Sequence, residues 1–132
     1  MQNTFSPTIG DLIAAYIYRY QFLDLFFREF RYTHSDLTEI EGMVLLEKMI
    51  NSNLGESERE YLHILDLSLE ETHADSTKDF IEKSFRDFVK RLHTLLFEKE
   101  RERRLSGINS EDPQFLVIQS ELIQKAKLIG LK

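Results

Sequence analysis

The sequence predicts an all-α fold, with a compact helical bundle followed by a long helix and a C-terminal helical hairpin. The 132 residues, 42% of them hydrophobic, include only five glycines and two prolines. Few segments alternate as strands do, whereas apolar residues recur every three or four positions along most of the chain, which is the spacing of one helix face. We expect the bundle to occupy residues 1–91 and the hairpin residues 92–132.

The first half of the chain is expected to form four helices. A bend near Tyr20 and Gln21 should divide the first two, although the aromatic residues around it also alternate as in a strand. We prefer helix because the three- and four-residue spacing continues to Phe30. Ser57 and Glu60 form a capping box that predicts the start of the fourth helix. The expected helices span residues 7–20, 22–30, 40–50 and 58–67, with a turn at 33–36 and a connection at 70–75.

One long helix is expected from Ser76 to Leu105, with Ser76 as its N-cap and Asp79 completing a capping box. Five apolar residues form a stripe along it: Ile81, Phe85, Phe88, Leu92 and Leu95. After Phe97 the sequence is charged on all sides through residue 104. A helix of this length extends about 45 Å, so we expect its first half to be buried and its second half to project into water.

The last helix is expected over residues 111–129, with Pro113 in its first turn and Gly130 as its C-cap. The charged arm opposite offers little apolar surface to this helix, so part of its apolar stripe should stay exposed and bind a partner. The alternative is that the hairpin folds down on the bundle and these residues are ordinary core. The predicted partner-binding residues are Phe115, Leu116, Gln119, Leu122 and Ile123.

The candidate metal ligands do not form a convincing site. Two Glu-x-x-His pairs, Glu60/His63 and Glu70/His73, have the spacing found in di-iron bundles. On one helix, however, the pairs would lie ~15 Å apart along the axis, whereas a two-metal site needs about 4 Å. The chain has no cysteine, which excludes disulfides, cysteine zinc sites and iron–sulfur ligation. We therefore expect no metal and no cofactor.

Other chemical signals also favour a non-enzymatic protein. His34 stands beside Ser35 and Asp36, but adjacent residues do not form a catalytic relay. His93 lies beside the apolar stripe of the long helix and is expected at a packing margin. A basic strip on the same helix, interleaved with acidic residues, is expected to be a solvated face. The strip comprises Lys83, Arg86, Lys90 and Arg91.

The charge distribution argues against general nucleic-acid binding, because the net charge is −6. It is also uneven. Residues 36–75 hold 11 acidic and two basic residues, whereas residues 76–104 hold nine basic and six acidic ones. The aromatic-rich run near the N-terminus is interrupted by charges and is not expected to span a membrane.

The order of these segments resembles the C-terminal helicase-interaction domain of bacterial replicative primases of the DnaG type. The resemblance covers nearly the whole chain as a compact helical body, a long helix that ends in charged residues, and a terminal helix. The segments that carry it are residues 9–13, 61–67, 80–88, 100–107 and 111–127.

The resemblance implies a bundle similar to the N-terminal domain of the replicative hexameric helicase (DnaB type), here residues 7–90. It also implies that the hairpin docks on that helicase domain, recruits primase to the replication fork and modulates the helicase, in the bacterial cytoplasm. Primer synthesis would reside in other parts of such a primase, so this chain alone is expected not to be an enzyme. When free it is expected to be a monomer.

Three alternatives remain open. The chain could be a free-standing helical adaptor that dimerises through the long helix, although the stripe stops at Phe97. It could be a metal-dependent bundle, or a weak nucleic-acid binder that uses the basic strip.

Overall fold

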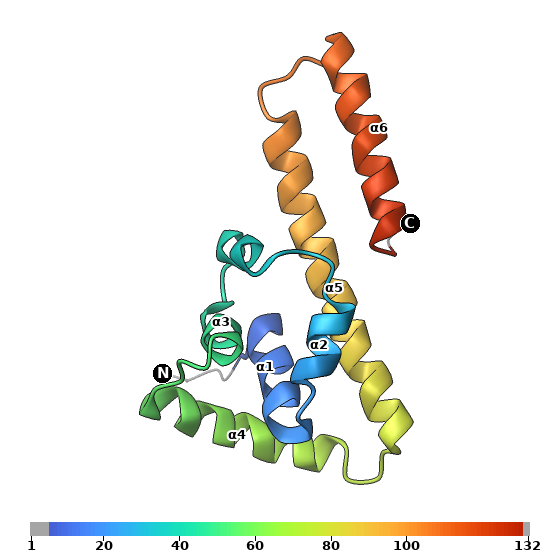
Figure 1. Cartoon of the computed structure of the whole chain (residues 1–132). Helices are drawn as coiled ribbons and strands as arrows, with labels where there is room; N and C mark the ends of the chain where they lie inside the picture. The colour runs from blue at the N-terminus through green and yellow to red at the C-terminus, as the bar shows by residue number, and fades with distance from the viewer. Residues whose placement is uncertain (1–5, 131–132) are drawn as a thin grey trace.

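The computed structural model describes residues 6–130, and all secondary structure in that range is helical, which confirms the all-α prediction. The bundle lies at one end of the molecule, and α5 leads out of it to α6 (Figure 1). In chain order the helices are α1 (Ile9–Tyr20), α2 (Leu23–Glu29), the 3-10 helix η1 (His34–Glu39), α3 (Val44–Ile50), α4 (Glu56–Thr72), α5 (Lys78–Leu105) and α6 (Pro113–Leu128).

Helix α1 forms the centre of the bundle and packs against α3, α4 and α5. Ile13, Ala14 and Ala15 have no exposed surface, so three successive residues of this helix are buried on different sides. A helix that is apolar on all sides belongs in a core. The small alanine side chains allow the neighbouring helices to approach its backbone.

The expected bend between the first two helices is confirmed. Helix α1 ends at Tyr20, and Gln21 adopts a left-handed conformation with φ of 57°. The chain then turns into α2, where Phe26 is fully buried and stacks on Phe30 with ring centroids 4.8 Å apart. The alternating aromatic residues therefore do not form a strand: Tyr16 and Phe22 pack on Phe85 of α5, whereas Tyr18 is 43% exposed.

Gly10 marks the closest approach of α1 to the segment before α3. A Cβ atom at Gly10 would lie 2.6 Å from the carbonyl oxygen of Gly42 and 2.8 Å from Met43 Sδ. The Thr8 hydroxyl donates a hydrogen bond of 2.7 Å to the same Gly42 oxygen, which holds the two segments together. The absence of a side chain at position 10 is thus required by packing.

We expect Gly10→Ala to lower the free energy of unfolding by about 1–3 kcal/mol, the usual cost of overpacking a well-filled core. The loss should occur although alanine is intrinsically about 1 kcal/mol better than glycine in a helix. Urea denaturation followed by circular dichroism measures the change. An unchanged or higher midpoint would show that the Gly42 backbone moves aside without cost.

Several helix boundaries in the bundle differ from the sequence-based expectation. The 33–36 turn is the start of the 3-10 helix η1, and the third helix begins at Val44, not at residue 40. Helix α4 is capped by Gly55 and Glu58 in place of Ser57 and Glu60: the Gly55 N–H donates to Glu58 Oε1 at 2.6 Å. The fourth helix also continues to Thr72, because Leu69 packs into the core and keeps this segment helical.

Helix α5 begins at Lys78, and its N-cap is Thr77, whose hydroxyl accepts a hydrogen bond from the Phe80 N–H. The prediction of Ser76 as the cap was wrong, because the Ser76 hydroxyl lies 3.0 Å from His73 Nδ1 instead. The helix is continuous to Leu105. The predicted boundary between residues 91 and 92 therefore falls within one unbroken helix.

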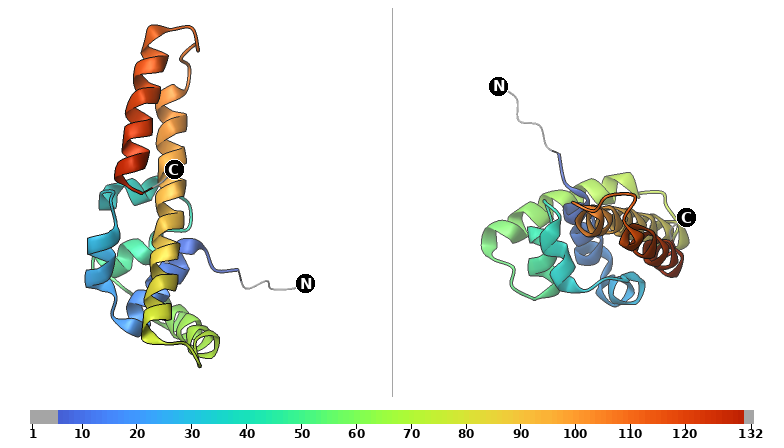
Figure 2. Two further views of the ribbon diagram at one scale, coloured as in Figure 1. Left: turned by 90° about the vertical axis from the view of Figure 1, so that its right-hand side faces the viewer. Right: turned by 90° about the horizontal axis from the view of Figure 1, so that it is seen from above.

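Helix α6 runs antiparallel to the C-terminal half of α5, and the loop between them lies farthest from the bundle (Figures 1 and 2). Asp112 is its N-cap and Pro113 its first residue; Gly130, with φ of 84°, follows its end. The charged arm of α5 does not simply project into water, since α6 covers one side of it. Three ion pairs hold this arrangement: Lys125–Glu100, Arg104–Glu121 and Arg103–Glu39.

Candidate protein-docking surface of the terminal hairpin

The inner face of α6 packs against α5 through three buried residues. Leu122 is 3% exposed, and Ala126 and Ile129 follow it at the spacing of one helix face. The apolar α5 residues that share a surface with Leu122 and Ala126 are Phe97 and Leu105. This narrow apolar seam, flanked by the ion pairs, fixes the position of α6 on α5.

A groove opens beside this seam, with a volume of about 540 Å³. One wall comes from α5 and the other from α6. Because residues four apart share a helix face, each wall presents a continuous row of side chains. The α5 wall consists of Phe97, Arg101 and Leu105, and the α6 wall of Gln119, Leu122, Ile123, Ala126 and Lys127.

The α6 side of this groove continues into an exposed apolar ridge, which we define as Leu116 and Ile123. Their exposed fractions are 66% and 59%. Val117, 57% exposed, lies on a different face of the helix, about 100° around the axis from Leu116. Ile123 lines the groove itself. Leu116 lies seven residues, or about two turns, before Ile123 and therefore on the same side of the helix. The groove and the ridge together form an apolar feature of the hairpin that no described part of the chain covers.

The five predicted partner-binding residues take three different environments. Leu116, Gln119 and Ile123 are exposed on the groove side of α6, whereas Phe115 is half-buried. Only part of the stripe was expected to be exposed, and Leu122 belongs to the buried part: it is 3% exposed and lines the groove between α5 and α6. Val117 was not among the predicted residues, because it lies off the apolar stripe from which they were chosen.

Two cations flank the groove without a carboxylate partner. Arg101 stands on the α5 wall and Lys127 on the α6 wall. Within residues 6–130, neither forms an ion pair, while the neighbouring Arg103, Arg104 and Lys125 all do. The groove is thus an apolar channel with one positive charge on each side, which favours a partner that carries carboxylates beside apolar residues.

A polar cluster fastens the hairpin to the bundle near the middle of α5. Lys125 Nζ lies 2.6 Å from Glu100 Oε1 and 4.5 Å from the ring centroid of Tyr32. Burial raises the pKa of the Tyr32 hydroxyl, and the carboxylates of Glu100 and Asp36 raise it further. Because these groups come from α6, α5 and the segment around η1, they hold the docking surface in a defined position relative to the bundle.

The two Glu-x-x-His pairs do not form a metal site. His73 is buried against Tyr16, whose hydroxyl lies 2.7 Å from Nε2, and burial lowers the pKa of this imidazole. His63 is exposed on α4. Across residues 6–130 no three histidine or carboxylate side chains lie close enough together to hold a metal ion.

His34 and its neighbours also serve the local structure. The imidazole of His34 stacks on Phe27, with ring centroids 5.4 Å apart. Asp36 accepts a hydrogen bond from the Thr33 N–H, and the Ser35 hydroxyl lies 3.0 Å from the Thr33 hydroxyl. These contacts begin the 3-10 helix η1 and form no relay between the three residues.

His93 is a buried residue at the junction of the bundle and the hairpin, where the sequence indicated only a packing margin. It is 4% exposed and stacks on Phe30. Its Nε2 accepts a hydrogen bond of 3.0 Å from the Arg31 N–H, which places the imidazole proton on Nδ1. Burial, with a smaller contribution from the Arg31 charge, lowers the pKa of His93 to about 4.

The comparisons with known proteins identify no relative: no protein-family model, no curated protein and no solved structure matches this chain. A search of the described helices for a membrane span found none that is both long and apolar enough. The assignment of function therefore depends on the surface of the hairpin and on the sequence resemblance.

Proposed function

We propose that this chain is a protein-docking module of the kind found at the C-terminus of DnaG-type primases, and that its hairpin binds the N-terminal domain of the replicative helicase. The observation that carries the docking role is the apolar groove with its exposed ridge, on a hairpin that stands away from the bundle (Figure 1). Exposed apolar surfaces of this kind are characteristic of interaction sites.

The shape of the groove suits a helix of the partner. Its two walls are the antiparallel helices α5 and α6, and an amphipathic helix laid between them could bury Leu116 and Ile123 at the three- and four-residue spacing of its own apolar face. Arg101 and Lys127 would then meet carboxylates at the edges of that helix. Such rim charges contribute orientation and association rate more than affinity.

The choice of helicase as partner rests on the sequence resemblance, which the all-helical body, long helix and terminal hairpin support at the level of architecture. The alternative hypothesis, that the chain is an adaptor which dimerises through α5, has less support. The second half of α5 is occupied by α6 on one side and carries ion pairs to α6 and η1 on others. It leaves no apolar stripe for a coiled-coil partner.

Substitution of the ridge tests this proposal. Leu116→Asp and Ile123→Asp should each weaken binding to the helicase N-terminal domain of the same organism by at least about tenfold, or 1.4 kcal/mol, because a buried apolar contact is replaced by a charge. Isothermal titration calorimetry measures the affinity. Both side chains are exposed in the free chain, so neither change should alter its helical content.

Ile64→Asp is the matched control, because Ile64 is 53% exposed on α4, in the bundle. It should bind as the unaltered chain does. No binding of the unaltered chain at micromolar concentration would overturn the helicase assignment. Sedimentation analysis would then show whether two copies of this chain associate, as the adaptor hypothesis requires.

A further inference from the structure

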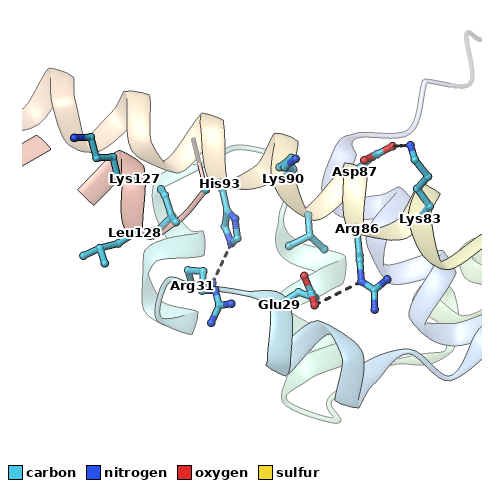
Figure 3. Close-up of a pocket in the computed structure, with 12 residues that line it drawn as sticks. Glu29, Arg31, Lys83, Arg86, Asp87, Lys90, His93, Lys127 and Leu128 are labelled. Atoms are coloured by element: carbon cyan, nitrogen blue, oxygen red, sulfur yellow. Dashed lines mark hydrogen bonds and ion pairs between the residues drawn. The ribbon is translucent and has the colours of Figure 1, made fainter. Parts of the chain in front are cut away.

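A second cleft, separate from the docking groove, lies where the end of α6 meets the bundle (Figure 3). Its volume is about 440 Å³. The lining comes from three parts of the chain: Glu29 at the end of α2 with Arg31 two residues later, one face of α5, and residues 127–130 at the end of α6. Each of these three parts contributes at least one charged side chain to the lining.

The cleft is basic in a protein whose net charge is −6. Its charged lining consists of two carboxylates, Glu29 and Asp87, and five cations: Arg31, Lys83, Arg86, Lys90 and Lys127. Both carboxylates are engaged, since Asp87 pairs with Lys83 at 3.3 Å and Glu29 with Arg86 at 3.5 Å. An excess of positive charge therefore remains around the cleft.

Three cations carry this excess: Arg31, Lys90 and Lys127. Within residues 6–130, no carboxylate lies within ion-pair distance of any of them. They come from three different elements, so helix periodicity alone did not bring them together. The backbone of Arg31 is held by its hydrogen bond to His93 Nε2, and His93 is neutral at physiological pH because its pKa is lowered.

The charges are spread along the cleft. Figure 3 shows Arg31 and His93 near its middle, Lys127 toward one end, and the Lys83–Asp87 pair at the other. A single small anion could contact only part of such a row. A chain of two or three linked phosphates could contact several of its members at once, with lysine acting as a point charge and arginine as a forked donor.

We propose that this cleft binds a small polyanion of the nucleoside polyphosphate class through Arg31, Lys90 and Lys127. Its volume is in the range of small-ligand sites, about 300–1,000 Å³. Because Lys127 belongs to α6 and Arg31 to the bundle, the ligand bridges hairpin and bundle. A nucleic-acid backbone is disfavoured, because Glu29 and Asp87 line the cleft among its cations and Glu82 pairs with Arg86 beside it.

Calorimetric titration of the full chain with ATP, and separately with inorganic triphosphate, tests the proposal at low salt. One-site binding is expected, and Arg31→Gln and Lys90→Gln should each weaken it by about tenfold through loss of one charged contact. These two positions are chosen because Lys127 also borders the docking groove. The result is therefore independent of whether the helicase binds.

Lys99→Gln is the control, since Lys99 is an exposed lysine of α5 that lines neither the cleft nor the groove. It should bind as the unaltered chain does. If ATP and triphosphate bind with equal affinity, the cleft recognises the phosphates alone. Tighter binding of ATP would show that the nucleoside makes an additional contact. No saturable binding at millimolar concentrations, equal weakening by all three variants, or binding of single-stranded DNA without triphosphate would overturn the proposal.

Discussion

Leu122→Asp is expected to detach α6 from α5 while the bundle stays folded. Loss of a buried leucine side chain costs about 2–5 kcal/mol, and burial of an unpaired carboxylate adds to that cost. The seam that holds α6 is narrow, with Leu122, Ala126 and Ile129 as its buried residues on the α6 side. A free helix of 16 residues is only marginally stable in water, so α6 should lose most of its helical structure.

Hydrogen exchange measured peptide by peptide separates the two parts of the molecule. Amides of residues 113–128 should lose protection in Leu122→Asp, whereas those of α1 and of the first half of α5 should keep it, because the cluster around Phe26 and Phe85 does not include α6. Leu116→Asp, on the exposed side of the same helix, should leave all protection unchanged. A protected α6 in Leu122→Asp would contradict the assignment of this side chain to the seam.

This outcome also determines how docking experiments are interpreted. A variant at position 122 that fails to bind a partner would report the loss of the hairpin and not the loss of a contact. Substitution of Leu116 or Ile123 tests docking directly. Both side chains are exposed in the free chain, so their replacement should leave its fold unchanged.

The helical class and the hairpin could be predicted because they depend on local periodicity. The spacing of Phe85, Phe88 and Leu92 specifies one face of a helix whatever lies opposite, and Pro113 specifies a helix start. Boundaries were less accurate where a tertiary contact decides them. Leu69 extends α4 because it reaches the core, and Ser76 is not a cap because its hydroxyl meets His73.

The exposure of the proposed contact residues was predictable only in part, because the apolar stripe of α6 does not reveal which of its residues face α5. The arm opposite looked too polar to bury all of them. In the structure Glu100 and Arg104 pair with Lys125 and Glu121, on the sides of the seam, and so leave Leu122 free to pack inward. Ion pairs between segments 17 to 25 positions apart cannot be read from local sequence patterns.

The buried state of His93 was not predictable for the same reason. Its acceptor nitrogen is satisfied by the backbone N–H of Arg31, 62 positions earlier in the chain. The basic cleft likewise depends on the end of α6 returning to the bundle, where Lys127 joins residues of α5 that the sequence marks as an ordinary solvated strip.

The stability of the chain is expected to fall as the pH decreases from 6.5 toward 4, and His93 is the main cause. Its pKa is about 4 in the folded chain and 6.5 in the unfolded one. Above pH 6.5 the imidazole is neutral in both states and the full stability is present. Below pH 6.5 the unfolded chain binds a proton that the folded chain excludes, so unfolding is favoured by about 1.4 kcal/mol per pH unit, or about 2 kcal/mol at pH 5.

Urea denaturation between pH 7.5 and 4.5 measures how the free energy of unfolding depends on pH. Substitution of His93 shows how much of that dependence this residue causes. In His93→Gln the slope should decrease, since glutamine does not titrate and its side-chain oxygen can accept the Arg31 N–H. His73, whose pKa is also lowered by burial, contributes in the same direction and accounts for a residual slope. An NMR titration in which the His93 ring protons shift with a midpoint near pH 6.5 in the folded chain would contradict the prediction. The imidazole would then be accessible to protons, and the junction of hairpin and bundle would open more readily than its packing indicates.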